Sequence, residues 1–228
     1  MNRFLILFIP LLLLTVTDLY SQSMVDYTTK VSDTCWRVDY YVRRGPLFRI
    51  ESYKDKKKTI AHGRFAFYDD DGWVDSTGFY VNGERNGTWH YYNDKGKLYL
   101  SREYNRDVVV SEKKHERVPG SKKEPLKEGE KEAEFTGGLF IWRLYLQKSL
   151  RYPREAINAR IGGEVRVAFL VDTTGAVQDT WVFRSAEQSL DKESMRLIEV
   201  SPSWTPAQQN GRKVKSYKIQ PITYKTPK

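Results

Sequence analysis

Two alternating segments in the last half of the chain constrain its fold most. Hydrophobic residues occupy every second position from Val165 to Val171, which is the spacing of a strand with one buried face. A second segment, from Val177 to Phe183, also alternates. The residues between them, Asp172-Thr173-Thr174-Gly175, predict a tight turn, because glycine there can adopt a positive φ. We therefore predict an antiparallel β-hairpin.

Helical patterns surround this hairpin. Upstream, apolar residues recur at steps of three and four, at Leu139, Trp142, Leu146 and Leu150, which predicts a helix with one buried face. Pro153 should end this helix and open a second one to about Arg160. Downstream, a third helix carries its inner residues at Leu190, Ser194, Leu197 and Ile198. A last strand over 214–224 follows the Asn210-Gly211 turn. The predicted fold is α+β, with helices on one face of a small antiparallel three-stranded sheet.

These residues resemble the C-terminal domain of the TonB energy transducers. The matching motifs are Tyr152-Pro153-x-x-Ala156, Ile161-x-Gly163-x-Val165-x-Val167-x-Phe169, Asp172-x-x-Gly175-x-Val177, Leu190-Asp191, Trp204-x-Pro206, Asn210-Gly211 and Pro221-Ile222-x-Tyr224. The resemblance implies a periplasmic domain, here residues 135–228, that binds the TonB box of outer-membrane transporters. It also implies that Tyr152 and Pro153 lie beside the receptor contact. It provides no catalytic residue and no cofactor.

The last strand is the candidate for the peptide contact. An edge strand leaves unpaired backbone groups to which an extended peptide can add. The residues that we expect at this edge are Val214, Lys215, Ser216, Tyr217, Lys218, Ile219 and Gln220. Lys213, Lys215 and Lys218 would favour an acidic peptide. Alternatively, these lysines only protect the edge against aggregation.

An internal repeat occupies the first half of the chain. Gly63, Phe65, Asp70 and Gly72 recur 24 residues later as Gly87, Trp89, Asp94 and Gly96, and a weaker copy begins near Val38. Alternating aromatic residues between glycine turns predict β-hairpins. The pattern from Gly87 to Gly96 resembles the MORN-like repeats of exported bacterial proteins, so we predict an all-β array over residues 24–110.

Two features of this array could also indicate a ligand site. Asp69, Asp70 and Asp71 could suggest a calcium loop, but Phe67 occupies its first ligand position and turn chemistry explains the aspartates better. The Tyr and Trp rows could form a stacking platform for carbohydrate or nucleic acid. Aromatic residues at a period of two more often make the core of a sheet.

The segments before and after the array differ in composition. Arg3 precedes an apolar run of 13 residues, Phe4–Val16, which is shorter than the roughly 20 residues that cross a bilayer. We predict a signal peptide over residues 1–21, cleaved after Ser21. An uncleaved signal anchor over Phe4–Leu19 would instead hold the protein in the inner membrane. Residues 111–134 are rich in Lys, Glu, Pro and Gly and predict a charged flexible linker.

Composition narrows the functional classes. Residues 135–228 hold 15 Lys and Arg against 8 Asp and Glu, a balance of +7 out of the total +9. With the single Cys35, three widely spaced histidines and no GxSxG motif, we predict neither a metal site nor an enzyme. Nucleic-acid binding is disfavoured, because the predicted signal peptide would export the protein from the cytoplasm.

The partners follow from the resemblance. The apolar run contains no histidine and residues 111–134 contain two prolines, whereas the TonB family has a functional histidine in its anchor and a long Pro-rich spacer. The leading prediction is a periplasmic TonB-like protein that binds a TonB-dependent outer-membrane transporter in energy-coupled transport. An inner-membrane proton-motor complex and a second copy of the chain are further candidate partners. The alternative is a cell-envelope scaffold whose MORN-like repeats bind protein, glycan or lipid.

Overall fold

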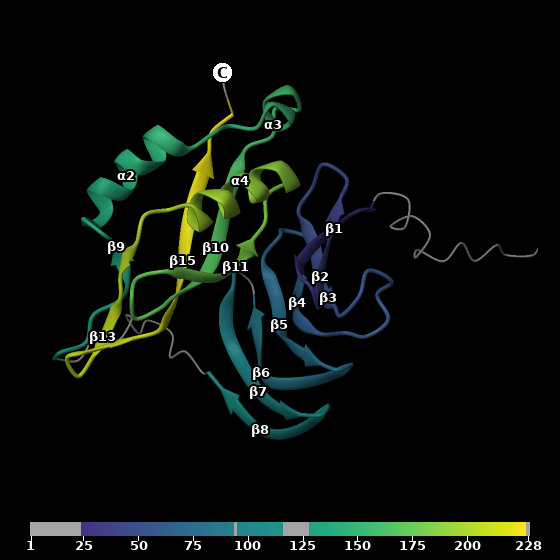
Figure 1. The fold of residues 1–228 in the computed structure, drawn as a ribbon. Helices are drawn as coiled ribbons and strands as arrows, with labels where there is room; N and C mark the ends of the chain where they lie inside the picture. Colours follow the sequence, from purple (N-terminus) through teal and green to yellow (C-terminus); the bar gives the residue numbers. More distant parts are fainter. Residues whose placement is uncertain (1–23, 94, 116–127, 227–228) are drawn as a thin grey trace, which may run out of the picture.

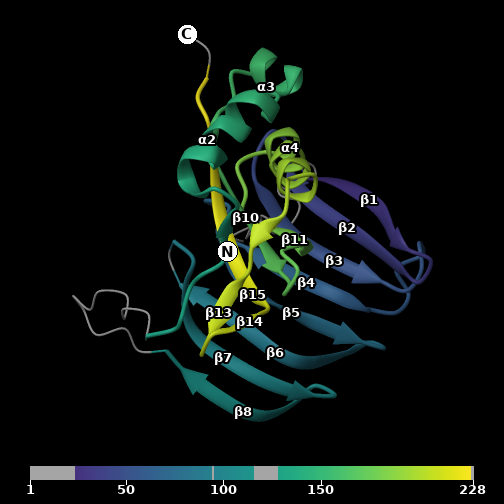
Figure 2. The same ribbon diagram turned by 60° about the vertical axis from the view of Figure 1, so that its left-hand side comes forward.

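The computed structural model describes residues 24–93, 95–115 and 128–226. They form an eight-stranded antiparallel sheet with a smaller α+β unit packed against it (Figure 1 and Figure 2), so the predicted fold class is confirmed. The predicted signal peptide and half of the predicted linker, residues 116–127, lie outside the described residues. Within those three ranges, no helix is both long and apolar enough to span a membrane.

In the large sheet each strand pairs with the next one along the chain. Its strands are β1 (Met24–Ser32), β2 (Cys35–Val42), β3 (Leu47–Tyr53), β4 (Gly63–Tyr68), β5 (Val74–Val81), β6 (Glu84–Asn93), β7 (Lys97–Asn105) and β8 (Val108–Lys114). The two clearest copies of the repeat are the hairpins β4–β5 and β6–β7. In the β4–β5 turn, the Asp69 carboxylate accepts the backbone N–H groups of Asp71 and Trp73, which is the turn chemistry expected there.

The last strand of this sheet extends into the predicted linker. Ser111–Lys114 belong to β8, where Glu112 lies opposite Arg102 of β7. The two side chains form an ion pair at 2.7 Å. A cross-strand pair of opposite charges stabilises such a ladder, so a segment that is polar in sequence still forms a strand.

One face of the large sheet has its own aromatic core. The rings of Phe65, Trp89 and Tyr104 are buried there, with Trp89 and Tyr104 edge to face at 6.2 Å. The ring of Trp89 fills the space above Gly78, where a Cβ atom would lie 2.3 Å from it. Burial of these rings favours the sheet-core interpretation over the open stacking platform.

The smaller unit has the predicted order of elements with short additions. Its elements are β9 (Glu134–Phe135), α2 (Gly138–Ser149), α3 (Arg154–Asn158), β10 (Gly163–Val171), β11 (Val177–Arg184), α4 (Gln188–Glu199), β12 (Trp204–Thr205), β13 (Ala207–Gln209), β14 (Arg212–Val214) and β15 (Ser216–Tyr224). The strands β11, β10 and β15 form an antiparallel sheet in that spatial order, and α4 packs on β10 and β11. Trp204, almost fully buried, contacts the rings of Phe135, Trp142 and Phe169.

The two units share one continuous hydrophobic core. The second face of the large sheet contributes Tyr41, Leu47, Ile50, Tyr68 and Trp73 to it, among others. The backbone N–H of Leu47 donates to Ser185 Oγ at 2.7 Å, and Tyr68 donates its hydroxyl to the Val182 carbonyl. The sheet buries its apolar face against the α+β unit, because an isolated sheet would leave that face in water.

A buried carboxyl group lies at this interface. Asp191 of α4 is nearly fully buried and accepts hydrogen bonds from the Tyr41 hydroxyl at 3.1 Å and the Ala186 N–H at 3.1 Å. The Ser185 hydroxyl also donates to it. Asp191 therefore links β2 of the large sheet to the loop between β11 and α4.

Candidate functional site

The open edge of the three-stranded sheet is β15. It pairs with β10 along its whole length, from Ser216 opposite Val171 to Tyr224 opposite Gly163. Among the described residues, no strand pairs with its other edge. Ile222 and Tyr224 point into the core, whereas Tyr217 and Ile219 are 58% and 43% exposed. This edge therefore combines unpaired backbone groups with apolar side chains at alternate positions, as strand addition requires.

At the opposite edge of this sheet, the end of β11 is covered by the large sheet. The turn between β4 and β5 pairs with the end of β11 through a bridge between Trp73 and Arg184, and the N–H of Ser185 donates to the Gly72 carbonyl at 2.8 Å. The guanidinium groups of Arg166 and Arg184 lie 4.8 and 4.7 Å from the centre of the Trp73 ring. Within the described residues, β15 is thus the side on which this sheet can grow.

The predicted contact residues fall on two elements. Ser216 to Gln220 lie on β15 as expected, but Val214 belongs to β14 and pairs with Ala207 of β13. Lys215 connects the two strands. Asn210 and Gly211 both have positive φ, 50° and 74°, and close the β13–β14 hairpin. The predicted strand over 214–224 is therefore corrected: the open edge begins at Ser216.

Tyr152 and Pro153 lie at the other end of β15. The Tyr152 ring packs edge to face on Tyr224 at 5.5 Å, and its hydroxyl donates to the Ile161 carbonyl at 2.6 Å. Pro153 caps the start of α3. Gln220, the last of the predicted edge residues, is four residues from Tyr224 on β15, so a strand rise of about 3.3 Å per residue separates the two groups of predicted residues by about 13 Å. A peptide paired with residues 216–220 would reach Tyr152 only by continuing along β15 to Tyr224.

A polar contact not predicted from the sequence ties the open edge to the large sheet. The Tyr217 hydroxyl donates to the Asp179 carboxylate, which is also ion-paired with Arg64 of β4. Asp179 adopts a φ of +47°, next to the bulge in the pairing of β10 with β11. Burial and the bond to Asp179 raise the pKa of Tyr217. Arg64 and Asp179 are 115 positions apart, so no spacing in the sequence indicates this contact.

The three lysines differ in where they lie. Lys213 and Lys215 are exposed at the hairpin before β15, whereas Lys218 is half-buried, with its Nζ atom 5.9 Å from the centre of the Trp204 ring. An inward lysine of this kind also discourages edge-to-edge association. Of the three lysines, only Lys213 and Lys215 are exposed to solvent.

An α+β domain with one open edge strand is the class of domain that this geometry defines. Residues 148–226 match the family model described as Gram-negative bacterial TonB protein C-terminal, which is the family that the motifs of this segment resemble.

The chain is similar to two NMR structures of the Helicobacter pylori TonB C-terminal domain, at 23% and 24% identity. The matches cover 38% of this chain and 78% and 94% of those chains, with a TM-score of 0.30 in both. A comparison with curated proteins found no match.

Proposed function

We propose that this protein is a periplasmic, non-enzymatic TonB-like protein that binds the TonB box of an outer-membrane transporter by strand addition to β15. It would act in energy-coupled transport across the outer membrane. The observation that carries the proposal is the edge of β15 from Ser216 to Tyr224, which is fixed to β10 on one side and open on the other. The match of residues 148–226 to the TonB C-terminal family model supports it.

The large sheet has a defined place in this proposal. Its inner face packs on the α+β unit, and its β4–β5 turn pairs with the end of β11. Through Arg64 and Asp179 it also reaches Tyr217 on the binding strand. In this role the array orients the peptide-binding domain. A scaffold function of the repeats would have to use the remaining, outer surface of the sheet.

Binding of synthetic TonB-box peptides tests the proposal. The chain beginning at Gln22, which contains every described strand and helix, is titrated with peptides from a panel of Gram-negative outer-membrane transporters. We expect a binding peptide to shift the backbone amide signals of residues 216–220, because new ladder hydrogen bonds form there.

Backbone methylation of the peptide provides the matched control. Only every second peptide N–H can face β15. Methylating one alternate set of peptide nitrogens should therefore abolish binding, and methylating the other set should leave most of it. Equal binding of the two methylated peptides, or no amide shifts along β15 with any peptide, would contradict strand addition.

A further inference from the structure

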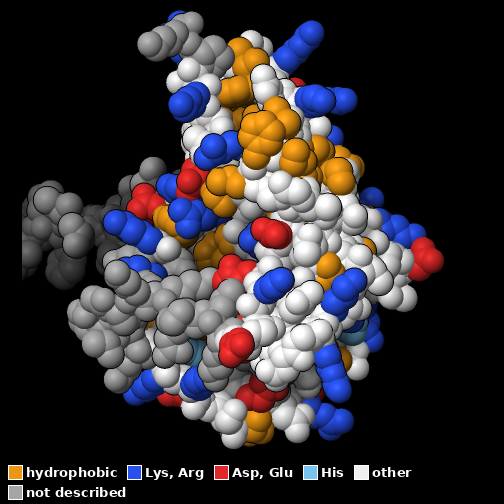
Figure 3. Space-filling model, turned by 90° about the vertical axis from the view of Figure 1, so that its left-hand side faces the viewer, with side chains coloured by type: hydrophobic (Ala, Val, Ile, Leu, Met, Phe, Trp, Pro, Cys, Tyr) orange, Lys and Arg blue, Asp and Glu red, His pale blue; other side chains and the backbone are white. Residues whose placement is uncertain are grey.

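The outer face of α2 is the most exposed apolar surface among the described helices. Leu139 and Phe140 are 63% and 69% exposed, and Ile141 and Leu144 are exposed as well. Figure 3 shows hydrophobic side chains gathered in a band on the side of the molecule where α2 lies, with Lys and Arg side chains around it. Exposed apolar patches of this kind usually mark an interaction surface.

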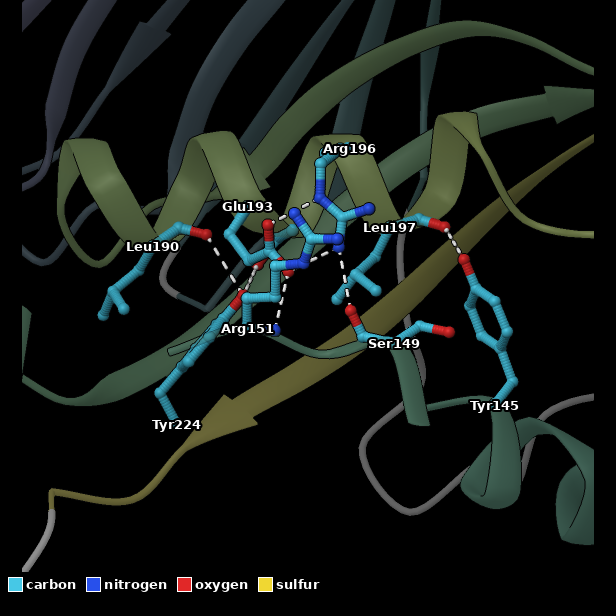
Figure 4. A network of polar contacts seen from close by, with 9 residues as sticks. Tyr145, Ser149, Arg151, Leu190, Glu193, Arg196, Leu197 and Tyr224 are labelled. Atoms are coloured by element: carbon cyan, nitrogen blue, oxygen red, sulfur yellow. Dashed lines mark hydrogen bonds and ion pairs between the residues drawn. The ribbon is translucent and has the colours of Figure 1, made fainter. Parts of the chain in front are cut away.

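The opposite face of α2 is fixed to the domain, so its outer face has a defined orientation. Trp142 is buried between Phe135 and Trp204, at ring distances of 5.2 and 5.7 Å. The Tyr145 hydroxyl donates to the Leu197 carbonyl at 2.8 Å, and Arg196 donates to the Ser149 carbonyl at 2.8 Å (Figure 4). These contacts to α4 hold the helix in place, so Phe140 and Leu144 cannot turn inward without breaking them.

The charge on α2 and on the segment that follows it to Arg154 has a single sign. Residues 135–154 contain four basic residues and no Asp or Glu. The basic residues, all exposed, are Arg143, Lys148, Arg151 and Arg154. A partner that covers the apolar residues must therefore accommodate several cations.

We propose that the outer face of α2 docks the protein onto an anionic phospholipid surface. Leu139, Phe140, Ile141 and Leu144 would enter the boundary between headgroups and acyl chains. The neighbouring Arg and Lys side chains would extend to the lipid phosphates, as in interfacial amphipathic helices. No residue of β15 takes part, so the docking is independent of peptide binding.

Electrostatics favours a membrane over a second copy of this chain. In a symmetric dimer the same patch would face itself, and the four cations of one copy would approach the four cations of the other. Like charges brought together in this way oppose association. An anionic bilayer neutralises them instead, because its lipid phosphates attract each cation near the surface.

Vesicle co-sedimentation tests the docking. The chain beginning at Gln22 is mixed with vesicles of phosphatidylcholine alone or of phosphatidylcholine with phosphatidylglycerol. We expect at least tenfold stronger partitioning onto the anionic vesicles, weakened by added salt. Replacing Phe140→Ser and Leu144→Ser together should reduce this partitioning about tenfold or more, since two apolar side chains no longer enter the boundary.

A matched variant distinguishes binding through this face from non-specific hydrophobic binding. Val108→Ser with Val110→Ser removes two other exposed apolar side chains, on β8, and should leave vesicle binding unchanged. Unchanged thermal midpoints of both variants would show that they fold. Equal binding to neutral and anionic vesicles, or unaltered binding by the α2 variant, would overturn the proposal. A dimer in sedimentation equilibrium that the α2 variant abolishes would also overturn it.

Discussion

Replacing Gly175 by alanine is expected to lower the free energy of unfolding by about 3 kcal/mol or more. Gly175 closes the β10–β11 turn with a φ of +91°, and a Cβ atom there would lie 2.0 Å from the carbonyl oxygen of Trp204. The Gly175 carbonyl also accepts the Trp204 N–H at 2.9 Å. An added methyl group must therefore displace the backbone beneath the central ring of the aromatic core. Urea unfolding monitored by tryptophan fluorescence measures the loss.

Gly211 is the matched control for this substitution. It also has a positive φ, +74°, but a Cβ atom there would meet nothing within 4 Å. Gly211→Ala should therefore lower the free energy of unfolding only by the cost of placing alanine in the left-handed conformation, about 1–2 kcal/mol. Equal losses in the two variants would show that the close approach to Trp204 contributes nothing.

A strong pH dependence of stability is the second large effect that we expect, and it depends on Asp191. Burial raises the pKa of Asp191 to about 7 in the folded protein, against about 3.9 in an unfolded chain. Between about pH 4 and pH 7 the unfolded chain is ionised at this site while the folded protein keeps the proton. Stability from this group is thus complete below about pH 4, falls as the pH rises to about 7, and then levels off.

Asp191→Asn should remove this component. The difference in unfolding free energy between pH 4 and pH 7.5 should be smaller in the variant by on the order of 3 kcal/mol, because asparagine does not ionise. Asp70→Asn, at an exposed position of the β4–β5 turn, should keep the wild-type dependence. Parallel curves for the wild type and Asp191→Asn, from urea unfolding at each pH, would exclude Asp191 as the source.

The individual strands and helices of this fold could be predicted, because their hydrophobic residues and turn glycines recur at regular intervals. Alternation from Val165 to Val171 predicts β10, and the apolar steps around Trp142 predict α2. Glycine turns spaced 24 residues apart predict the hairpins of the large sheet. In each case a single buried face and its turn residues are sufficient to define the element.

The packing of the two units could not be predicted in the same way. Periodicity shows that a strand has a buried face, but it does not show what covers that face. One signal was present: Trp181, Val182 and Phe183 are three consecutive apolar residues, and all three are buried. Such a run is typical of a strand covered on both faces. Here α4 covers one face of β11, and the large sheet covers the other.

Only part of the candidate site could be predicted from the sequence. The edge position of residues 216–220 could be predicted, because the last strand of a small sheet often lies at its edge. Val214 does not lie on this edge, because a hairpin only three residues long on each side interrupts the alternation. The contact of Tyr217 with Asp179 and Arg64 depends on tertiary structure alone.

The turn at Gly72 and Trp73 limits the stoichiometry of any strand that adds to the small sheet. This turn pairs with Arg184, the last residue of β11, and the Tyr68 hydroxyl donates to the Val182 carbonyl, so a guest strand can pair along its full length only next to β15. A sheet open at both edges could recruit strands repeatedly and polymerise. This sheet would instead saturate with one guest strand for each chain and form complexes of fixed size.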